Sequence, residues 1–436
     1  MKLKFTLTGI MLLALFAVAQ SQVPTPRYGH SVCKIDGMYY IYGGYKIGNK
    51  KSTNLENYLT SKLYRYNVGQ KKFVPIEQPG GPSVGFHNSF VSNAKMIIFG
   101  GERSNTSDNA VYSFATNSNT WQQEATQPFS SRKQMAGDTI GGKVYICGGL
   151  NSDNTTSTDV YVYDPDVSTF VKKADMPQGG RYGHTAVNHN GNLLVYGGRN
   201  ENGEQGQMLS YNPNGNYWNF FDPVGMPPFA RANNLSGVLP DEMWIAGGET
   251  QSTFKSTQST NFFTDIWKLD LSQTPAKWIK KSENFIPVTS GVGWISVENN
   301  DTLFYSFGGI SEITSTGDTT VTNNFYRYNI TESIVEQYHE DIENWGNVIT
   351  SINENDFNQN INLQIYPNPA TSEISLAIPN NESIVSIKIY NQNGQLVKQI
   401  FKPNAEKINI SDLKTGIYFI RTDTDTNRYL SKMMKD

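Results

Sequence analysis

Charged side chains recur beside pairs of glycines in this 436-residue chain. Glu102 and Glu249 each directly follow a Gly-Gly pair, and Arg199 directly follows another. A carboxylate can transfer protons, and a guanidinium can hold a developing negative charge. One glutamate beside an arginine could therefore open or epimerise a sugar ring, which makes Glu102 and Glu249 the candidate catalytic residues.

Other kinds of chemistry have no matching pattern in the sequence. The five histidines, His30, His87, His184, His189 and His339, lack the spacing of metal ligands. No nucleophile elbow and no phosphate-binding loop occurs. The formal net charge is −3, and the Lys and Arg residues are dispersed, which argues against nucleic-acid binding. We therefore expect no metal, no cofactor and no nucleic-acid partner.

The elements that position the charged residues are six copies of one repeat. The glycine pairs lie about 50 residues apart, a period typical of repeat architectures. They are Gly43-Gly44, Gly100-Gly101, Gly148-Gly149, Gly197-Gly198, Gly247-Gly248 and Gly308-Gly309. Two hydrophobic strands precede each pair and a third follows it, and in five of the six repeats an aromatic residue opens a fourth strand.

This order resembles the kelch family from Arg27 to about Tyr338. The resemblance implies an all-β fold, a six-bladed kelch β-propeller in which each blade is a four-stranded antiparallel sheet. The sixth repeat departs from the pattern, because Val335 stands where the other repeats have an aromatic residue.

One mouth of the central channel should carry the charged residues. In an antiparallel meander, the start of the first strand and the end of the second lie at the same end of the blade. The expected ligand-binding arginines at this mouth are Arg27, Arg132, Arg181, Arg199 and Arg231. The alternative is that an arginine at the head of a strand braces neighbouring loops. Glu102 and Glu249 should face each other across the ring, farther apart than the roughly 5 to 9 Å of a glycosidase pair.

Three loops near this mouth are longer than the others. They are 45–61, 250–263 and 311–323, in repeats 1, 5 and 6, which ring closure makes neighbours. Long loops on a rigid scaffold commonly carry binding sites. We expect them to form a wall along the mouth, with Tyr58 and Phe254 as contacts for a hydroxyl-rich ligand. The alternative is mobile surface.

The N-terminal residues 1–21 have the features of a secretory signal peptide. Lys2 and Lys4 precede a short apolar stretch and small residues suited to cleavage. No later apolar run is long enough to span a membrane. Cys33 and Cys147 lie in repeats that are not adjacent, so we expect two free thiols.

A second domain follows the repeats. We expect the propeller over 24–339, a linker over 340–361, and a small Ig-like β-sandwich over 362–436. The last segment resembles the C-terminal sorting domain of type IX secretion. The residues that carry this resemblance are Tyr366, Pro367, Asn368, Pro369, Gly394, Gly416, Tyr418 and Lys432. It implies contact with the secretion machinery and a location outside the cell or at the outer-membrane surface.

Together these features predict a secreted or cell-surface propeller, expected to be a monomer, that binds a glycan or protein ligand at the channel mouth. The alternative is a sugar isomerase or mutarotase similar to sialate epimerases, which would use a rim glutamate and arginine.

Overall fold

The computed structural model describes residues 23–46, 57–78, 80–104, 109–129, 131–254, 257–283, 285–313, 319–339, 344–348, 363–378, 382–391, 396–401, 407–424 and 428–436. Every regular element in these ranges is a β-strand. None of these residues forms a helix long and apolar enough to cross a membrane. The expected signal peptide and most of the expected linker lie outside these ranges.

The repeats fold into antiparallel sheets whose strands follow the order of the chain. The first sheet comprises β2 (Ser31–Ile35), β3 (Met38–Tyr42), β5 (Leu63–Asn67) and β6 (Lys72–Ile76), and the second β7 (Val84–Ser92), β8 (Lys95–Arg103), β9 (Ala110–Ala115) and β10 (Thr120–Thr126). The third comprises β12 (Ala136–Ile140), β13 (Lys143–Cys147), β15 (Val160–Asp164) and β16 (Thr169–Lys172), and the fourth β17 (Tyr182–His189), β18 (Asn192–Asn200), β20 (Met208–Asn212) and β21 (Tyr217–Phe221). The fifth comprises β22 (Leu235–Leu239), β23 (Glu242–Ala246), β26 (Ile266–Asp270) and β27 (Lys277–Ser282), and the sixth β28 (Val292–Glu298), β29 (Asp301–Phe307), β32 (Phe325–Asn329), β33 (Ile334–His339) and β34 (Asn344–Val348).

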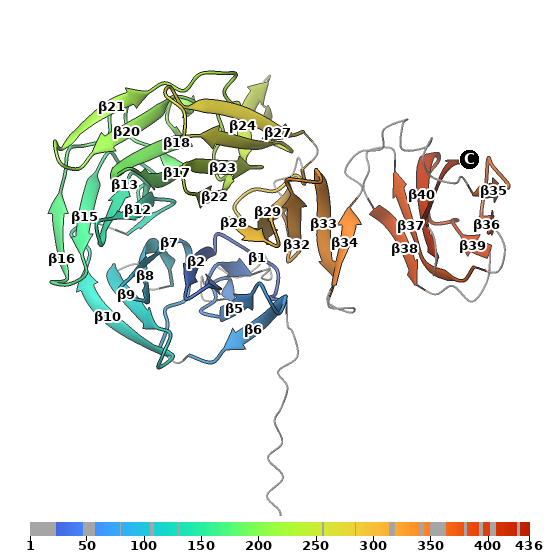
Figure 1. Ribbon diagram of the computed structural model, residues 1–436, viewed down its shortest axis with the longest axis horizontal. Helices are drawn as coiled ribbons and strands as arrows, with labels where there is room; N and C mark the ends of the chain where they lie inside the picture. The colour runs from blue at the N-terminus through green and yellow to red at the C-terminus, as the bar shows by residue number, and fades with distance from the viewer. Residues whose placement is uncertain are drawn as a thin grey trace, which may run out of the picture.

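These sheets stand around a central axis as the blades of a β-propeller (Figure 1). The first strand of each sheet is innermost, and β2 of the first sheet contacts β28 of the sixth, which closes the ring. We call the end of the ring that carries the glycine pairs the Gly-Gly face. The opposite end, where tight turns join β2 to β3 and the equivalent strands of the other sheets, is the turn face.

Hydrophobic cores lie between neighbouring sheets. Phe99 of the second sheet packs edge-on against Tyr163 of the third, with ring centroids 5.2 Å apart. The aromatic residue of each fourth strand packs towards the preceding sheet, as Trp278 does against Tyr196 at 5.2 Å. Val335 is 2% exposed and takes the same place between the fifth and sixth sheets. Val335 therefore fills the place of the missing aromatic residue, and the core between these two sheets is complete despite the departure from the pattern.

The glycine pairs allow neighbouring sheets to approach closely. Gly43 has φ of 67°, and a Cβ there would lie 2.6 Å from the carbonyl oxygen of Val84 in the next sheet. Gly148 has φ of 65°, and its Cβ would lie 2.2 Å from the carbonyl oxygen of Arg181. Both the left-handed backbone and the lack of space require glycine at these positions.

The sixth sheet gains a fifth strand that the sequence places in the linker. β34 pairs with β33, and Trp345 is 8% exposed in the core that joins the sixth and first sheets. The centroid of the Trp345 ring lies 4.8 Å from that of Phe325. The Arg327 guanidinium lies over the Trp345 ring, 4.5 Å from its centroid. Burial of this one indole extends the propeller beyond residue 339.

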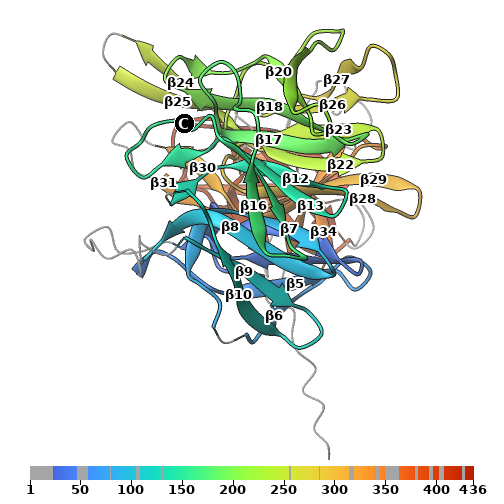
Figure 2. The same cartoon turned by 90° about the vertical axis from the view of Figure 1, so that its left-hand side faces the viewer.

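Short two-stranded ribbons rise from the Gly-Gly face, and Figure 2 shows two of them, β24–β25 and β30–β31, projecting from the same side. They are β1 (Arg27–Tyr28) with β4 (Tyr45–Lys46), β11 (Arg132–Lys133) with β14 (Leu150–Asn151), β24 (Glu249–Phe254) with β25 (Thr257–Phe262), and β30 (Ile310–Ile313) with β31 (Thr319–Val321). In the fourth sheet, β19 (Gly203–Glu204) pairs with the end of β18. Two of the three long loops are thus hairpins in their described parts.

The C-terminal domain is a sandwich of two antiparallel sheets. One contains β35 (Gln364–Tyr366), β36 (Glu373–Ala377) and β39 (Lys407–Asn409). The other contains β38 (Leu396–Phe401), β37 (Ile384–Asn391), β40 (Gly416–Thr424) and β41 (Arg428–Lys435). A single core lies between them and includes Ile374, Ile389, Ile408 and Ile420. The strand β41 was not expected from the sequence.

Candidate functional site

The arginines that open the first strands lie beneath the Gly-Gly face. Arg27, Arg181 and Arg231 are fully buried, with exposed fractions of 0%, and Arg132 is 5% exposed. Each donates Nη1 to the carbonyl oxygen of the first glycine of its own repeat, at distances of 3.0 to 3.4 Å. A guanidinium held in this way braces the glycine turn and has no surface to offer a ligand. The bracing alternative therefore describes these four residues.

Two of the bracing arginines also have acidic partners. Nη2 of Arg132 lies 2.7 Å from Asp159, and Nη1 of Arg231 lies 2.5 Å from Asp265. Burial alone would raise the pKa of Asp265, but hydrogen bonds and charge from Arg231 outweigh it and lower that pKa. Each aspartate directly precedes the third strand of its repeat, a sequence signal that would have identified the pairs.

A closed ring of backbone hydrogen bonds narrows the channel at the Gly-Gly face. It joins one residue from each repeat, just before or at the start of the innermost strand, and N–H groups donate in one direction around the axis. The bonds run from Gly29 to Ser290, Ser290 to Asn233, Asn233 to Gly183, Gly183 to Gln134, Gln134 to Phe86 and Phe86 to Gly29, with N···O distances of 2.6 to 3.0 Å. All six residues have φ between 53° and 64°. We call this feature the hydrogen-bonded ring.

Side chains add to the closure at the same level. Nε2 of Gln134 donates to Oδ1 of Asn233 at 2.8 Å, which links the third sheet to the fifth across the mouth. The Phe86 ring packs against Tyr28 and Tyr45, with centroids 5.8 and 5.5 Å apart. The expected mouth is therefore constricted at the level of the hydrogen-bonded ring, where the space measures about 120 Å³.

On one side of the mouth, Glu102 joins the first three sheets. Its Oε2 accepts hydrogen bonds from the Tyr45 hydroxyl at 2.6 Å and from Lys133 Nζ at 2.8 Å. Burial acts to raise the pKa of Glu102, and these two donors together lower it. The Glu102 and Lys133 side chains are 31% and 30% exposed, and Tyr28 stacks on Tyr45 at a centroid distance of 5.0 Å. We call Tyr28, Glu102 and Lys133 the rim cluster.

On the other side, Glu249 and Arg199 belong to a buried network. Arg199 donates Nε and Nη2 to Glu204 Oε1 at 3.0 and 2.7 Å, and lies 3.9 Å from Glu249 Oε1. Glu249 also accepts from Asn233 Nδ2 at 3.1 Å, and burial raises its pKa. Both the Arg199 and Glu249 side chains are only 10% exposed. These contacts hold the two groups in place.

The remaining expected contacts lie on the ribbons. The Tyr58 carbonyl accepts a hydrogen bond from the backbone N–H of Lys46 in β4 at 2.7 Å, and the Tyr58 side chain is half-buried. Phe254 ends β24 opposite Thr257, and its side chain is outside the described set. No group of three or more His, Cys, Asp or Glu gathers to hold a metal in the part of the chain that the structure describes. Cys33 and Cys147 are both free and buried.

The sorting motif of the C-terminal domain docks onto the last strand. Asn368 donates Nδ2 to the Lys432 carbonyl at 2.9 Å and accepts from Met434 N at 2.8 Å. Ala370, which follows Pro367 and Pro369 in the chain, is buried, and its backbone N–H donates to the Met434 carbonyl at 2.9 Å. The Tyr418 hydroxyl donates to the Lys414 carbonyl at 2.8 Å. The motif thus fixes the start of the domain to its end, while Gly394 lies outside the described residues.

Comparisons with known proteins agree with both domains. The family description "KLHDC2/KLHL20/DRC7 Kelch-repeats domain" matches residues 16–176, 53–248 and 137–340, and "Secretion system C-terminal sorting domain" matches residues 364–436. Kelch domain-containing protein 3 of Rattus norvegicus is 26% identical over 249 residues, which are 53% of this chain and 63% of that protein. Kelch-like protein 36 of Mus musculus is 26% identical over 275 residues, 57% of this chain and 41% of that protein.

Each of these alignments spans less than two thirds of the relative's length. The solved structure of YjhT is similar with a TM-score of 0.54 and 18% identity, covering 71% of this chain and 97% of that one. That similarity concerns the fold.

Proposed function

Because the chain belongs to the kelch-repeat family and ends in a secretion-system sorting domain, we propose that it is a binding module of the cell exterior, exported by type IX secretion, whose Gly-Gly face takes a glycan or protein ligand. The sorting domain implies export and a location outside the cell or on its surface. The propeller supplies a rigid surface for recognition.

The rim cluster is the observation that carries this proposal. Among the charged residues expected at the mouth, Glu102 keeps about a third of its side chain exposed, beside the equally exposed Lys133. An anionic acceptor next to a cationic donor can bind the two ends of a vicinal diol or of a peptide amide. Tyr28 stands beside them as an aromatic surface, and aromatic faces pack well against the C–H face of a sugar ring.

The ribbons extend the proposed site. β24–β25 and β30–β31 rise from neighbouring sheets on the Gly-Gly face. The backbone N–H of Gln251 in β24 donates to Oε1 of Glu204 in β19 at 2.8 Å, which ties this ribbon to the fourth sheet. A ribbon anchored at its base can present side chains to a ligand that spans the mouth. We propose that this wall contributes to selectivity.

A glycan array followed by calorimetric titration tests the proposal. Lys133→Ala and Glu102→Gln should each weaken binding by about 1 to 3 kcal/mol, because each removes a charge-assisted hydrogen bond. The matched control is the Lys95–Glu124 pair of the second sheet, with atoms 3.3 Å apart, since Lys95 lies at the turn face. Lys95→Ala should leave affinity unchanged. Equal affinity in Lys133→Ala, Glu102→Gln and the parent would overturn the rim cluster as a site.

A further inference from the structure

The channel below the hydrogen-bonded ring opens into a chamber. Its volume is about 840 Å³, against about 120 Å³ for the space at the level of the ring. The wall is formed by the innermost strands β2, β7, β12, β17, β22 and β28. Since the ring narrows the Gly-Gly end, the wide end faces the turn face. A volume of this size is within the range of small-molecule sites, about 300 to 1,000 Å³.

Side-chain amides lie in the lining of this chamber. Oδ1 of Asn88 and Oδ1 of Asn234 are buried behind the lining and accept no hydrogen bond from any described residue. The Asn234 amide is oriented by its Nδ2, which donates to Thr185 Oγ1 at 3.0 Å. Because neither oxygen has accessible surface, a molecule in the chamber would meet the hydroxyls of the lining and not these two acceptors.

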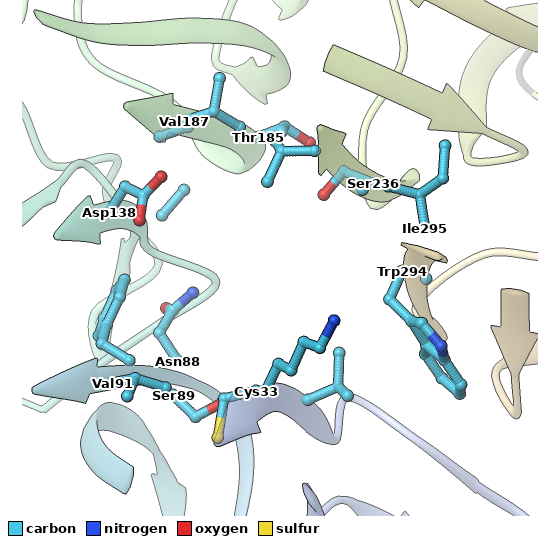
Figure 3. Close-up of a pocket in the computed structure, with 18 of the residues that line it drawn as sticks. Cys33, Asn88, Ser89, Val91, Asp138, Thr185, Val187, Ser236, Trp294 and Ile295 are labelled. Carbon is cyan, nitrogen blue, oxygen red and sulfur yellow. The ribbon is translucent and has the colours of Figure 1, made fainter. Parts of the chain in front are cut away.

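The other lining groups limit the charge of a ligand. Asp138 accepts Thr139 N and Asn188 N, both at 2.7 Å, one on each carboxylate oxygen. Its oxygens are thus already engaged, and a cation would find a single occupied carboxylate. Lys34 and Asp138 give the lining one positive and one negative side chain, which favours no net charge on a ligand. Figure 3 shows Asn88, Asp138, Thr185 and Ser236 on four different strands around the opening.

Apolar wall segments alternate with these polar groups. Val32, Val91 and Val238 lie between them in the lining, and hydroxyls are added by Thr185, Ser236 and Ser296. Alternation of small apolar surface with hydroxyls suits a molecule with O–H groups at its edge and C–H groups on its faces. We propose that the chamber is a second ligand site, which binds one neutral polyhydroxylated molecule of monosaccharide to disaccharide size that enters from the turn face.

This site is independent of the rim cluster. The two lie on opposite sides of the hydrogen-bonded ring and share no residue. Binding in the chamber can therefore be tested without any assumption about the ligand of the Gly-Gly face.

Saturation-transfer NMR on residues 22–436 with myo-inositol, methyl α-D-glucopyranoside and N-acetylglucosamine is the test. At least one probe should receive saturation from the parent protein. Ser236→Leu puts a larger side chain into the chamber and removes one of its hydroxyls, and should reduce that transfer at least tenfold. Lys407→Ala, at an exposed position of the C-terminal domain, should preserve it.

A second variant covers the case in which Ser236→Leu does not fold. Val238 lines the chamber and is 50% exposed, so Val238→Trp can narrow the entrance without disturbing a core. It should lower the transfer in the same way. Transfer that persists in both variants, or its absence for all three probes with only ordered water in a soaked crystal, would overturn the proposal.

Discussion

Arg231 and Asp265 form a buried ion pair at the base of the Gly-Gly face, with Nη1 2.5 Å from Oδ1 and Nη2 3.1 Å from Oδ2. Arg181 occupies the same position one repeat earlier, where Gln207 replaces the aspartate. Its Nη1 bonds to Gly197 O at 3.2 Å, and its Nε and Nη2 have no partner among the described residues. Burial lowers the pKa of Arg181 to about 10.

This contrast predicts different costs for the same substitution. Arg231→Met leaves Asp265 buried and unpaired, and should lower the free energy of unfolding by about 3 to 5 kcal/mol. Arg181→Met removes one hydrogen bond and also a poorly satisfied buried charge, so its cost should stay near 1 to 3 kcal/mol. Urea unfolding of both variants measures the difference. Two equal values, or an intact fold with lost ligand affinity in Arg181→Met, would contradict the bracing role.

Stability should fall as the solution is acidified, because histidines are buried between the sheets. Burial, with help from the charges of Arg103 and Arg181, lowers the pKa of His87 and His184 to about 3. An unfolded histidine takes up a proton near pH 6.5. Between these values the unfolded chain binds more protons, so the free energy of unfolding is highest above about pH 6.5 and decreases towards pH 3.

Each such histidine should account for about 2 kcal/mol of the loss between pH 7 and pH 5. His87→Gln should therefore reduce that loss by about this amount in urea unfolding at the two pH values. A loss that is the same with and without His87 would argue that this imidazole is protonated in the folded state.

The propeller should need residues up to Val348. A protein truncated after His339 lacks β34 and the Trp345 indole, and removal of a buried tryptophan costs about 3 to 5 kcal/mol. One truncated after Val348 keeps both and should melt at the temperature of the propeller in the full chain. Differential scanning calorimetry of the two proteins, with Trp345→Ala in the full chain as a third, checks this. Equal melting of the two truncated proteins would show that β34 is dispensable.

Export should depend on the docking of the sorting motif. Asn368→Ala removes two hydrogen bonds to β41, each contributing about 0.5 to 1.5 kcal/mol, and should shift protein from the medium to the periplasm. Deletion of residues 363–436 should retain a folded propeller in the periplasm. Immunoblots of the two fractions measure the ratio, with Asn409→Ala, at the exposed end of β39, as the control. Normal amounts of the deleted protein outside the cell would refute the sorting role.

The repeat architecture could be predicted because its signals are local. A Gly-Gly pair after a hydrophobic strand, repeated six times, predicts the repeat without knowledge of the rest of the fold. Val335 shows that another apolar residue can replace the aromatic residue of the fourth strand when it stays buried. The sandwich was predictable for the same reason, from short alternating strands. β34 was not, because one buried tryptophan in an Asn-rich stretch produces no periodicity.

The site could be predicted only in outline. Arg132 and Lys133 are neighbours of similar type, yet the first is buried under a glycine turn and the second is partly exposed. Burial depends on the neighbouring sheet, which a single repeat does not reveal. The hydrogen-bonded ring was also hidden, because Phe86, Gln134 and Ser290 are residue types that seldom indicate a left-handed backbone.

The direction of β34 determines the end of the propeller at which the chain leaves it. Val348 pairs with Val335 near the turn between β32 and β33, so the chain leaves the ring at the turn face. The chain towards the sorting domain therefore starts at the end of the ring where the chamber opens, and the rim cluster and its ribbons lie at the other end.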